Sequence, residues 1–93
     1  MDLLVSGHDH AYERMAPADP SGAIDPARGV RQIVVGTGGA ELYTADPSYS
    51  LLEAYGNAIY GVLRLDLAPA SYSWQFLPAG GVTYTDSGTT ACH

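Results

Sequence analysis

The sequence predicts a small, mainly β domain of about five strands, on the strength of three observations. In the expected strand at residues 58–67 apolar side chains alternate strictly from residue 63, and they alternate again at 72–76, which is the period of a strand with one buried face. Residues 30–35, VRQIVV, are rich in the β-branched residues that favour strands. Eleven glycines and six prolines among 93 residues indicate many short turns. We therefore expect mostly antiparallel pairing, with a short helix at most.

In the first half of the chain, two expected strands are separated by loops. Residues 3–5, LLV, form an apolar run that a Ser-Gly pair ends, as in a buried strand that enters a tight turn. Residues 8–14 follow as an irregular polar segment. Residues 15–28 contain prolines and small side chains and predict a surface loop. The strand at 30–35 stops at the glycine turn of residues 36–39.

The second half of the chain contains the clearest strand, at residues 58–67. An Ala-Pro-Ala turn at 68–70 joins it as a hairpin to residues 72–76, where Tyr, Trp and Phe alternate with Ser and Gln and form one aromatic face. Residues 40–57 are ambiguous, because residues 50–55 fit either one helical turn or a loose loop.

A last short strand is expected at residues 82–85, VTYT, after a Gly-Gly turn. Residues 86–93 then form a small, polar tail with the single cysteine, Cys92. One thiol cannot form a disulfide within the chain. We interpret Cys92 either as a free thiol or as half of a disulfide whose other half lies in chain not present here.

The charge balance excludes some classes of partner. The net charge is −6, with four arginines and no lysine, so the basic stripe that nucleic acid or an anionic membrane surface requires is missing. No apolar run approaches membrane-spanning length, and we see no signal peptide. A net-negative protein can still act on phosphate esters if metal ions supply positive charge at the site.

The segment Gly7-His8-Asp9-His10 carries the most specific chemistry. Two histidines at i and i+2 lie on one face of an extended chain, about 6.6 Å apart. Both imidazoles then reach one ion, or two ions held about 3.5–4 Å apart. Imidazole nitrogen suits zinc, iron and manganese, and Gly7 allows the backbone to turn sharply after the strand.

Two other interpretations of these histidines stay open. Histidines two positions apart are common in solvated loops and need bind nothing. A zinc site formed by His8, His10, Cys92 and His93 is a minor alternative, because these residue types all ligate zinc but a terminal tail tends to fray.

The surrounding sequence resembles a known family. Residues 2–14, DLLVSGHDHAYER, are similar to the last metal-binding block of purple acid phosphatases and their bacterial relatives, which are calcineurin-like metallophosphoesterases. The later strands and turns agree with this family as well, at residues 34–40 (VVGTGGA), 60–65 (YGVLRL), 72–76 (YSWQF) and 85–88 (TDSG, followed by Cys92). The resemblance covers nearly the whole chain.

The resemblance implies a fold and an activity. Residues 1–93 would be a partial metallophosphoesterase domain, the C-terminal part of an αββα sandwich. The complete enzyme would hold two ions of iron, zinc or manganese and hydrolyse phosphomonoesters through a metal-bound hydroxide. His8 would bind one ion and His10 the other, whereas Asp9 fills a variable position. The family implies supporting roles for four neighbours: Gly7, Tyr12, Glu13 and Arg14, with an Arg–carboxylate pair bracing the loop.

The chain also departs from the family. The bridging aspartate, the asparagine, a further metal histidine and the histidine beside the substrate all belong to blocks N-terminal to this segment. We therefore expect the isolated chain to be inactive. The alternative to a phosphatase is a non-catalytic β module, and the expected partner is the missing N-terminal part of the domain or another copy of the chain. Complete family members are often secreted.

Overall fold

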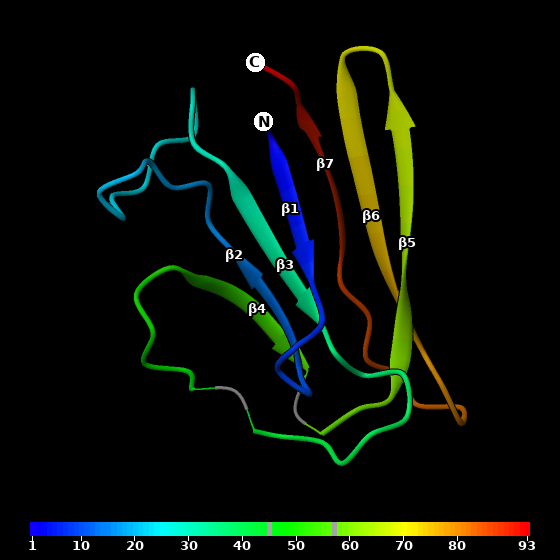
Figure 1. Ribbon diagram of the computed structural model, residues 1–93. Coiled ribbons are helices and arrows are strands. Elements are labelled where there is room, and N and C mark those ends of the chain that lie inside the picture. The colour runs from blue at the N-terminus through cyan, green and yellow to red at the C-terminus, as the bar shows by residue number, and fades with distance from the viewer. Residues whose placement is uncertain (45, 57) are drawn as a thin grey trace.

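The part of the chain that the structure describes forms seven strands in two sheets (Figure 1). This computed structural model describes residues 1–44, 46–56 and 58–93, and it shows no helix in that part of the chain. The first sheet contains β1 (Leu3–Ser6), β2 (Tyr12–Met15), β3 (Arg31–Val35) and β4 (Leu52–Gly56). The second contains β5 (Gly61–Ala68), β6 (Ser71–Pro78) and β7 (Ser87–Ala91).

Most of the strand pairing is antiparallel, as predicted. The first sheet has the order β1-β3-β2-β4 and the second the order β5-β6-β7. Of the five pairings, only that between β1 and β3 is parallel. β1 and β2 therefore flank β3, and the chain between them crosses the carboxyl end of β3.

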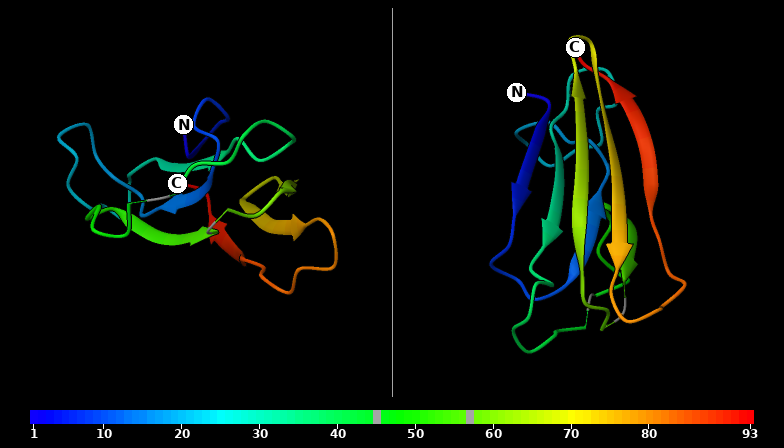
Figure 2. Two further views of the ribbon diagram at one scale, coloured as in Figure 1. Left: turned by 90° about the horizontal axis from the view of Figure 1, so that it is seen from below. Right: turned by 90° about the vertical axis from the view of Figure 1, so that its right-hand side faces the viewer.

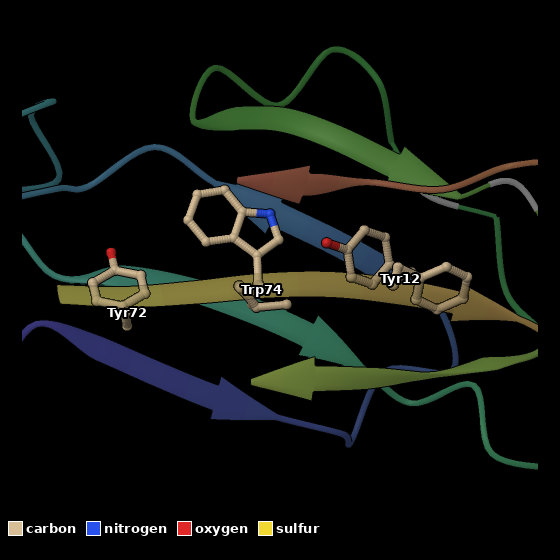
Figure 3. Packing of buried hydrophobic residues seen from close by; sticks show 5 residues of the cluster. Tyr12, Tyr72 and Trp74 are labelled. Carbon is tan, nitrogen blue, oxygen red and sulfur yellow. The ribbon is translucent and has the colours of Figure 1, made fainter. Parts of the chain in front are cut away.

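The two sheets lie one over the other around an aromatic core (Figure 2). The predicted aromatic face of β6 is confirmed, because its three aromatic side chains are all buried. Figure 3 shows Trp74 between Tyr72 and Tyr12 of β2. The ring centroid of Tyr12 lies 4.5 Å from that of Phe76. The core consists of Tyr12, Ile33, Tyr72, Trp74 and Phe76.

Three predictions about local structure were wrong. The segment 8–14 is irregular only as far as residue 11, because Tyr12–Met15 pairs with both β3 and β4. Residues 52–56 form β4 rather than a helical turn or loose loop, because β2 offers them a strand edge. The last strand is β7 at Ser87–Ala91, within the expected tail, whereas residues 82–85 lie outside the strands.

β7 forms from small side chains because a large one already fills the space beside it. Gly88 pairs with Trp74, and a Cβ on Gly88 would lie 2.5 Å from the indole ring. The predicted loop over residues 15–28 is confirmed beyond β2, apart from isolated bridges of Ala18 to Ile24 and to Val30, although residues 16 and 17 are buried rather than at the surface. Residues 45 and 57, within the ambiguous segment 40–57, lie outside the described residues.

The predicted mainly β class is therefore confirmed, with seven strands rather than about five. No segment of the described chain forms a helix of the length and hydropathy needed to cross a membrane.

Candidate functional site

The two candidate metal ligands lie in the histidine loop, residues 7–11, which joins β1 to β2 across the end of β3. Close backbone contact with Gly36 fixes the course of this loop. The Gly36 N–H donates to the carbonyl of Ala11 at 3.1 Å. A Cβ on Gly36 would lie 1.9 Å from the Asp9 carbonyl oxygen and 2.5 Å from that of Gly7. Only glycine fits here, which gives the predicted glycine turn a second role beside the site.

His10 contacts the segment that follows the glycine turn through both its ring and its backbone. Its Nδ1 lies 2.7 Å from the carbonyl oxygen of Glu41. Its ring stacks on Tyr43, with 4.5 Å between centroids and 19° between planes, and the Tyr43 N–H donates to the His10 carbonyl at 2.7 Å. A carbonyl only accepts, so Nδ1 carries a proton, and in the neutral form of the ring the lone pair then lies at Nε2. A metal-binding histidine commonly has this arrangement.

His8 lies in the same loop and is exposed. Within the described chain no hydrogen bond involves its ring. The expectation that the rings of His8 and His10 point to one side stays a prediction.

Three carboxylates surround an open cavity beside the loop. Asp9, Glu13 and Asp46 line a space of about 300 Å³ together with Tyr43 and Thr44. Burial raises the pKa of the Glu13 carboxyl, and the negative charges of Asp9 and then Asp46 raise it further. The field at this cavity is therefore negative and favours cations over anions.

The minor alternative of a zinc site with Cys92 and His93 was wrong. No group of three or more His, Cys, Asp or Glu side chains is arranged for a metal in the part of the chain that the structure describes. His93 instead contacts other residues: its ring Nε2 lies 2.9 Å from the Gly29 carbonyl oxygen, and its backbone N–H donates to Asp2 Oδ1 at 2.9 Å. Cys92 is a free, exposed thiol.

Tyr12 and Arg14 point between the sheets and share one carboxylate, Asp86. The Tyr12 hydroxyl donates to Asp86 Oδ2 at 2.6 Å, and Arg14 Nε donates to the same oxygen at 2.8 Å. Trp74 Nε1 adds a third hydrogen bond to this oxygen at 3.2 Å, and Arg14 Nη2 donates to Oδ1 at 3.2 Å. Burial alone would raise the pKa of Asp86, but the hydrogen bonds from Arg14 and Tyr12 outweigh it and hold that pKa below its usual value.

A second arginine completes this cluster. Glu53 Oε1 accepts hydrogen bonds from both Arg14 and Arg31. The two guanidinium carbons lie 5.1 Å and 4.9 Å from the centroid of the Trp74 ring, within the range of cation–π attraction. The carboxylates that brace Arg14 are therefore Asp86 and Glu53 from distant segments.

Sequence reasoning missed these partners, and only a weak signal was available for them. Asp86 stands in the short segment TDSG, and nothing in its local sequence pattern indicates a contact with β2. Glu41 and Tyr43 act largely through backbone groups, which every residue type carries.

The histidine loop thus presents the oriented imidazole of His10 and the exposed imidazole of His8 beside a negatively charged cavity. β2 connects this loop to the core. Comparison of the chain with protein-family models, with curated protein sequences and with solved structures gives no match.

Proposed function

We propose that this chain is the part of a two-metal phosphoesterase that contributes two imidazole ligands, His8 and His10. The observation that carries the proposal is the hydrogen bond from His10 Nδ1 to the Glu41 carbonyl, which leaves Nε2 free as a ligand. The resemblance of residues 2–14 to the last metal-binding block of the purple acid phosphatases supports it.

The residues present suit first-row metal ions. A neutral imidazole with its other nitrogen hydrogen-bonded to a carbonyl is a good ligand for zinc, iron or manganese. This chain has a net negative charge. Bound ions would therefore supply the positive charge that polarises a phosphoryl group. The substrate class we propose is the phosphomonoesters.

The chain's own residues would orient and tune the ligands. Tyr43 and Glu41 fix the plane and tautomer of the His10 ring. Gly36 fixes the backbone on either side of Asp9. The remaining ligands would come from outside these 93 residues, because a catalytic zinc normally has three protein ligands.

Zinc titration followed by NMR of the histidine ring protons tests the proposal directly. We expect Zn²⁺ to shift or broaden the His8 and His10 signals, and the affinity to fall at least tenfold in His8→Ala and in His10→Ala. His93→Ala is the matched control, because His93 bonds Gly29 and Asp2 instead, and it should bind zinc as the wild type does. Zinc binding that depends on His93 but not on His10 would refute the proposal.

A non-catalytic β module is the second candidate, and the edge strands favour it. Within the residues that the structure describes, β3 is the one strand paired with β1. Leu4 and Val5 of β1 are 45% and 41% exposed, although a parallel strand is usually covered on both faces. This arrangement suits a domain that adds its edge to another chain. Absence of any zinc effect on the His8 and His10 signals would favour this candidate.

A further inference from the structure

The strand β5 is one edge of the second sheet, and part of its backbone is unpaired. The Ala79 N–H donates to the Tyr60 carbonyl at 2.9 Å, so even-numbered residues along β5 bond β6 and odd-numbered residues turn their backbone groups outward. Thr37 occupies both groups of Gly61, through bonds of 3.1 Å and 2.9 Å. The outward N–H and C=O groups that remain belong to Leu63, Leu65 and Leu67.

Apart from the charges of Arg64 and Asp66, this edge lacks the features that normally protect one. β5 runs for eight residues without proline, lysine or a bulge. Leu67 is 77% exposed and Val62 58%. β6 is the only strand that pairs with β5 within residues 1–44, 46–56 and 58–93 (Figure 2, right).

The outer face of β5 carries one charge of each sign. Arg64 and Asp66 lie on the same face of the strand with their side chains 3.2 Å apart, and each side chain is 61% exposed. An edge with this pattern has complementary charges for a second strand that runs in the opposite direction.

We propose that a second copy of this chain pairs with β5, antiparallel, about a two-fold axis that passes through Leu65. In this register Leu63 lies opposite the partner's Leu67, and Leu65 opposite the partner's Leu65. Arg64 then faces the partner's Asp66, and by symmetry Asp66 faces the partner's Arg64. The three strands of each copy become one continuous sheet.

Backbone groups and charges select this register independently. An axis through Arg64 would oppose two arginines and would require Gly61, whose groups Thr37 already uses. An axis through Asp66 would oppose two aspartates and would require Pro69, which has no N–H. The axis through Leu65 uses all the free groups of Leu63, Leu65 and Leu67 in both copies. It also covers the exposed side chain of Leu67.

Sedimentation equilibrium of charge-swapped variants tests the pairing. We expect the wild type to reach twice the 9.8 kDa mass of the chain as concentration rises. Arg64→Asp and Asp66→Arg each place like charges opposite one another twice, and each should weaken the dimer about tenfold or more. The double variant restores both attractive pairs and should recover most of the wild-type affinity. Circular dichroism confirms that these exposed substitutions leave the fold intact.

Leu4→Glu is the control for the other edge, since Leu4 is exposed on β1. It should leave the dimer unchanged. A chain that stays monomeric at every concentration would overturn the proposal, as would single variants that dimerise like the wild type or a double variant no tighter than the singles. Loss of the dimer in Leu4→Glu alone would assign the interface to β1 and would equally overturn it. None of these outcomes depends on metal binding, so the phosphoesterase proposal is tested separately.

Discussion

Arg14 Nε donates to Asp86 Oδ2 at 2.8 Å, and this contact joins two residues that are 72 positions apart. Arg14 belongs to β2, which continues directly from the histidine loop, whereas Asp86 immediately precedes β7 in the second sheet. The side chains are 15% and 11% exposed, so water screens the pair weakly. The position of the histidine loop therefore depends on the second sheet as well as on its own.

The first prediction concerns this pair. Asp86→Asn should lower the free energy of unfolding by about 3 kcal/mol, because it leaves Arg14 without its main carboxylate partner in a largely buried place. Urea unfolding followed by tryptophan fluorescence measures the change. Glu41→Gln is the control, because this side chain is exposed, and it should change stability by less than about 0.5 kcal/mol. Equal effects of the two substitutions would contradict the assigned role of Asp86.

Acid should remove the stabilisation that the Asp86 carboxylate provides. The pKa of Asp86 is lower in the folded chain than in the unfolded chain, so its stabilising effect is complete above the unfolded pKa of about 3.9 and is lost as pH falls through the folded value. We expect the melting temperature of the wild type to fall below about pH 4. Asp86→Asn should melt at a lower temperature than the wild type at pH 7, and the difference should narrow at pH 2. A constant difference between the two proteins from pH 7 to pH 2 would count against this linkage.

Ionisation of Glu13 should destabilise the folded chain, whereas ionisation of Asp86 stabilises it. The pKa of Glu13 is raised in the folded chain by burial and by the charges of Asp9 and Asp46, so the ionised form opposes folding at neutral pH. Glu13→Gln should raise the melting temperature at pH 7, and the gain should vanish below about pH 4, where glutamate is protonated in both states. Thermal melts at several pH values check this. A destabilised variant at pH 7 would show that Glu13 has a favourable partner.

Gly36→Ala should displace the histidine loop. The added methyl would overlap the backbone carbonyls of Gly7 and Asp9, so we expect a loss of about 1–3 kcal/mol in the free energy of unfolding. Zinc affinity should fall as well, because His8 and His10 move with the loop. Gly38→Ala is the matched control, since a Cβ there meets nothing within 4 Å. Wild-type zinc affinity in a folded Gly36→Ala protein would show that Gly36 does not position the two histidines.

The isolated chain should not turn over phosphomonoesters. Two imidazoles leave most coordination positions of each ion to water, so we expect no useful hydrolysis of a chromogenic phosphomonoester with added zinc, iron or manganese. The release of the chromogenic product over hours measures this. Metal-dependent turnover that His10→Ala abolishes would show that the chain supplies more ligands than the two histidines.

Strands are easiest to predict from the sequence where apolar or β-branched residues clearly define a buried face. β6 was predictable because Tyr72, Trp74 and Phe76 alternate with polar residues, and β3 because β-branched residues dominate it. β4 and β7 were not, because they contain few such residues and depend on partners brought by the fold. Gly88 is an example: glycine has low strand propensity, but only glycine fits at this position of β7 beside the indole ring of Trp74.

The site was predictable to a similar extent. His8 and His10 could be singled out because their spacing suits metal binding and their context resembles a known block. The support around them could not, because the contacts of His10 with Glu41 and Tyr43 span more than 30 positions and include backbone groups. The two carboxylates that bind Arg14 likewise lie 39 and 72 positions away.

The hydrogen bonds that reach Asp86 also affect the order in which the protein can acquire its shape. During synthesis, Tyr12 and Arg14 emerge before their acceptor, which is made more than 70 residues later. Contacts of such long sequence separation must overcome a large loop-closure entropy, which slows folding. The histidine loop can therefore reach its final position only late, after residue 86 has joined the chain. Until then, the sheet edges that await partners remain open to neighbouring nascent chains.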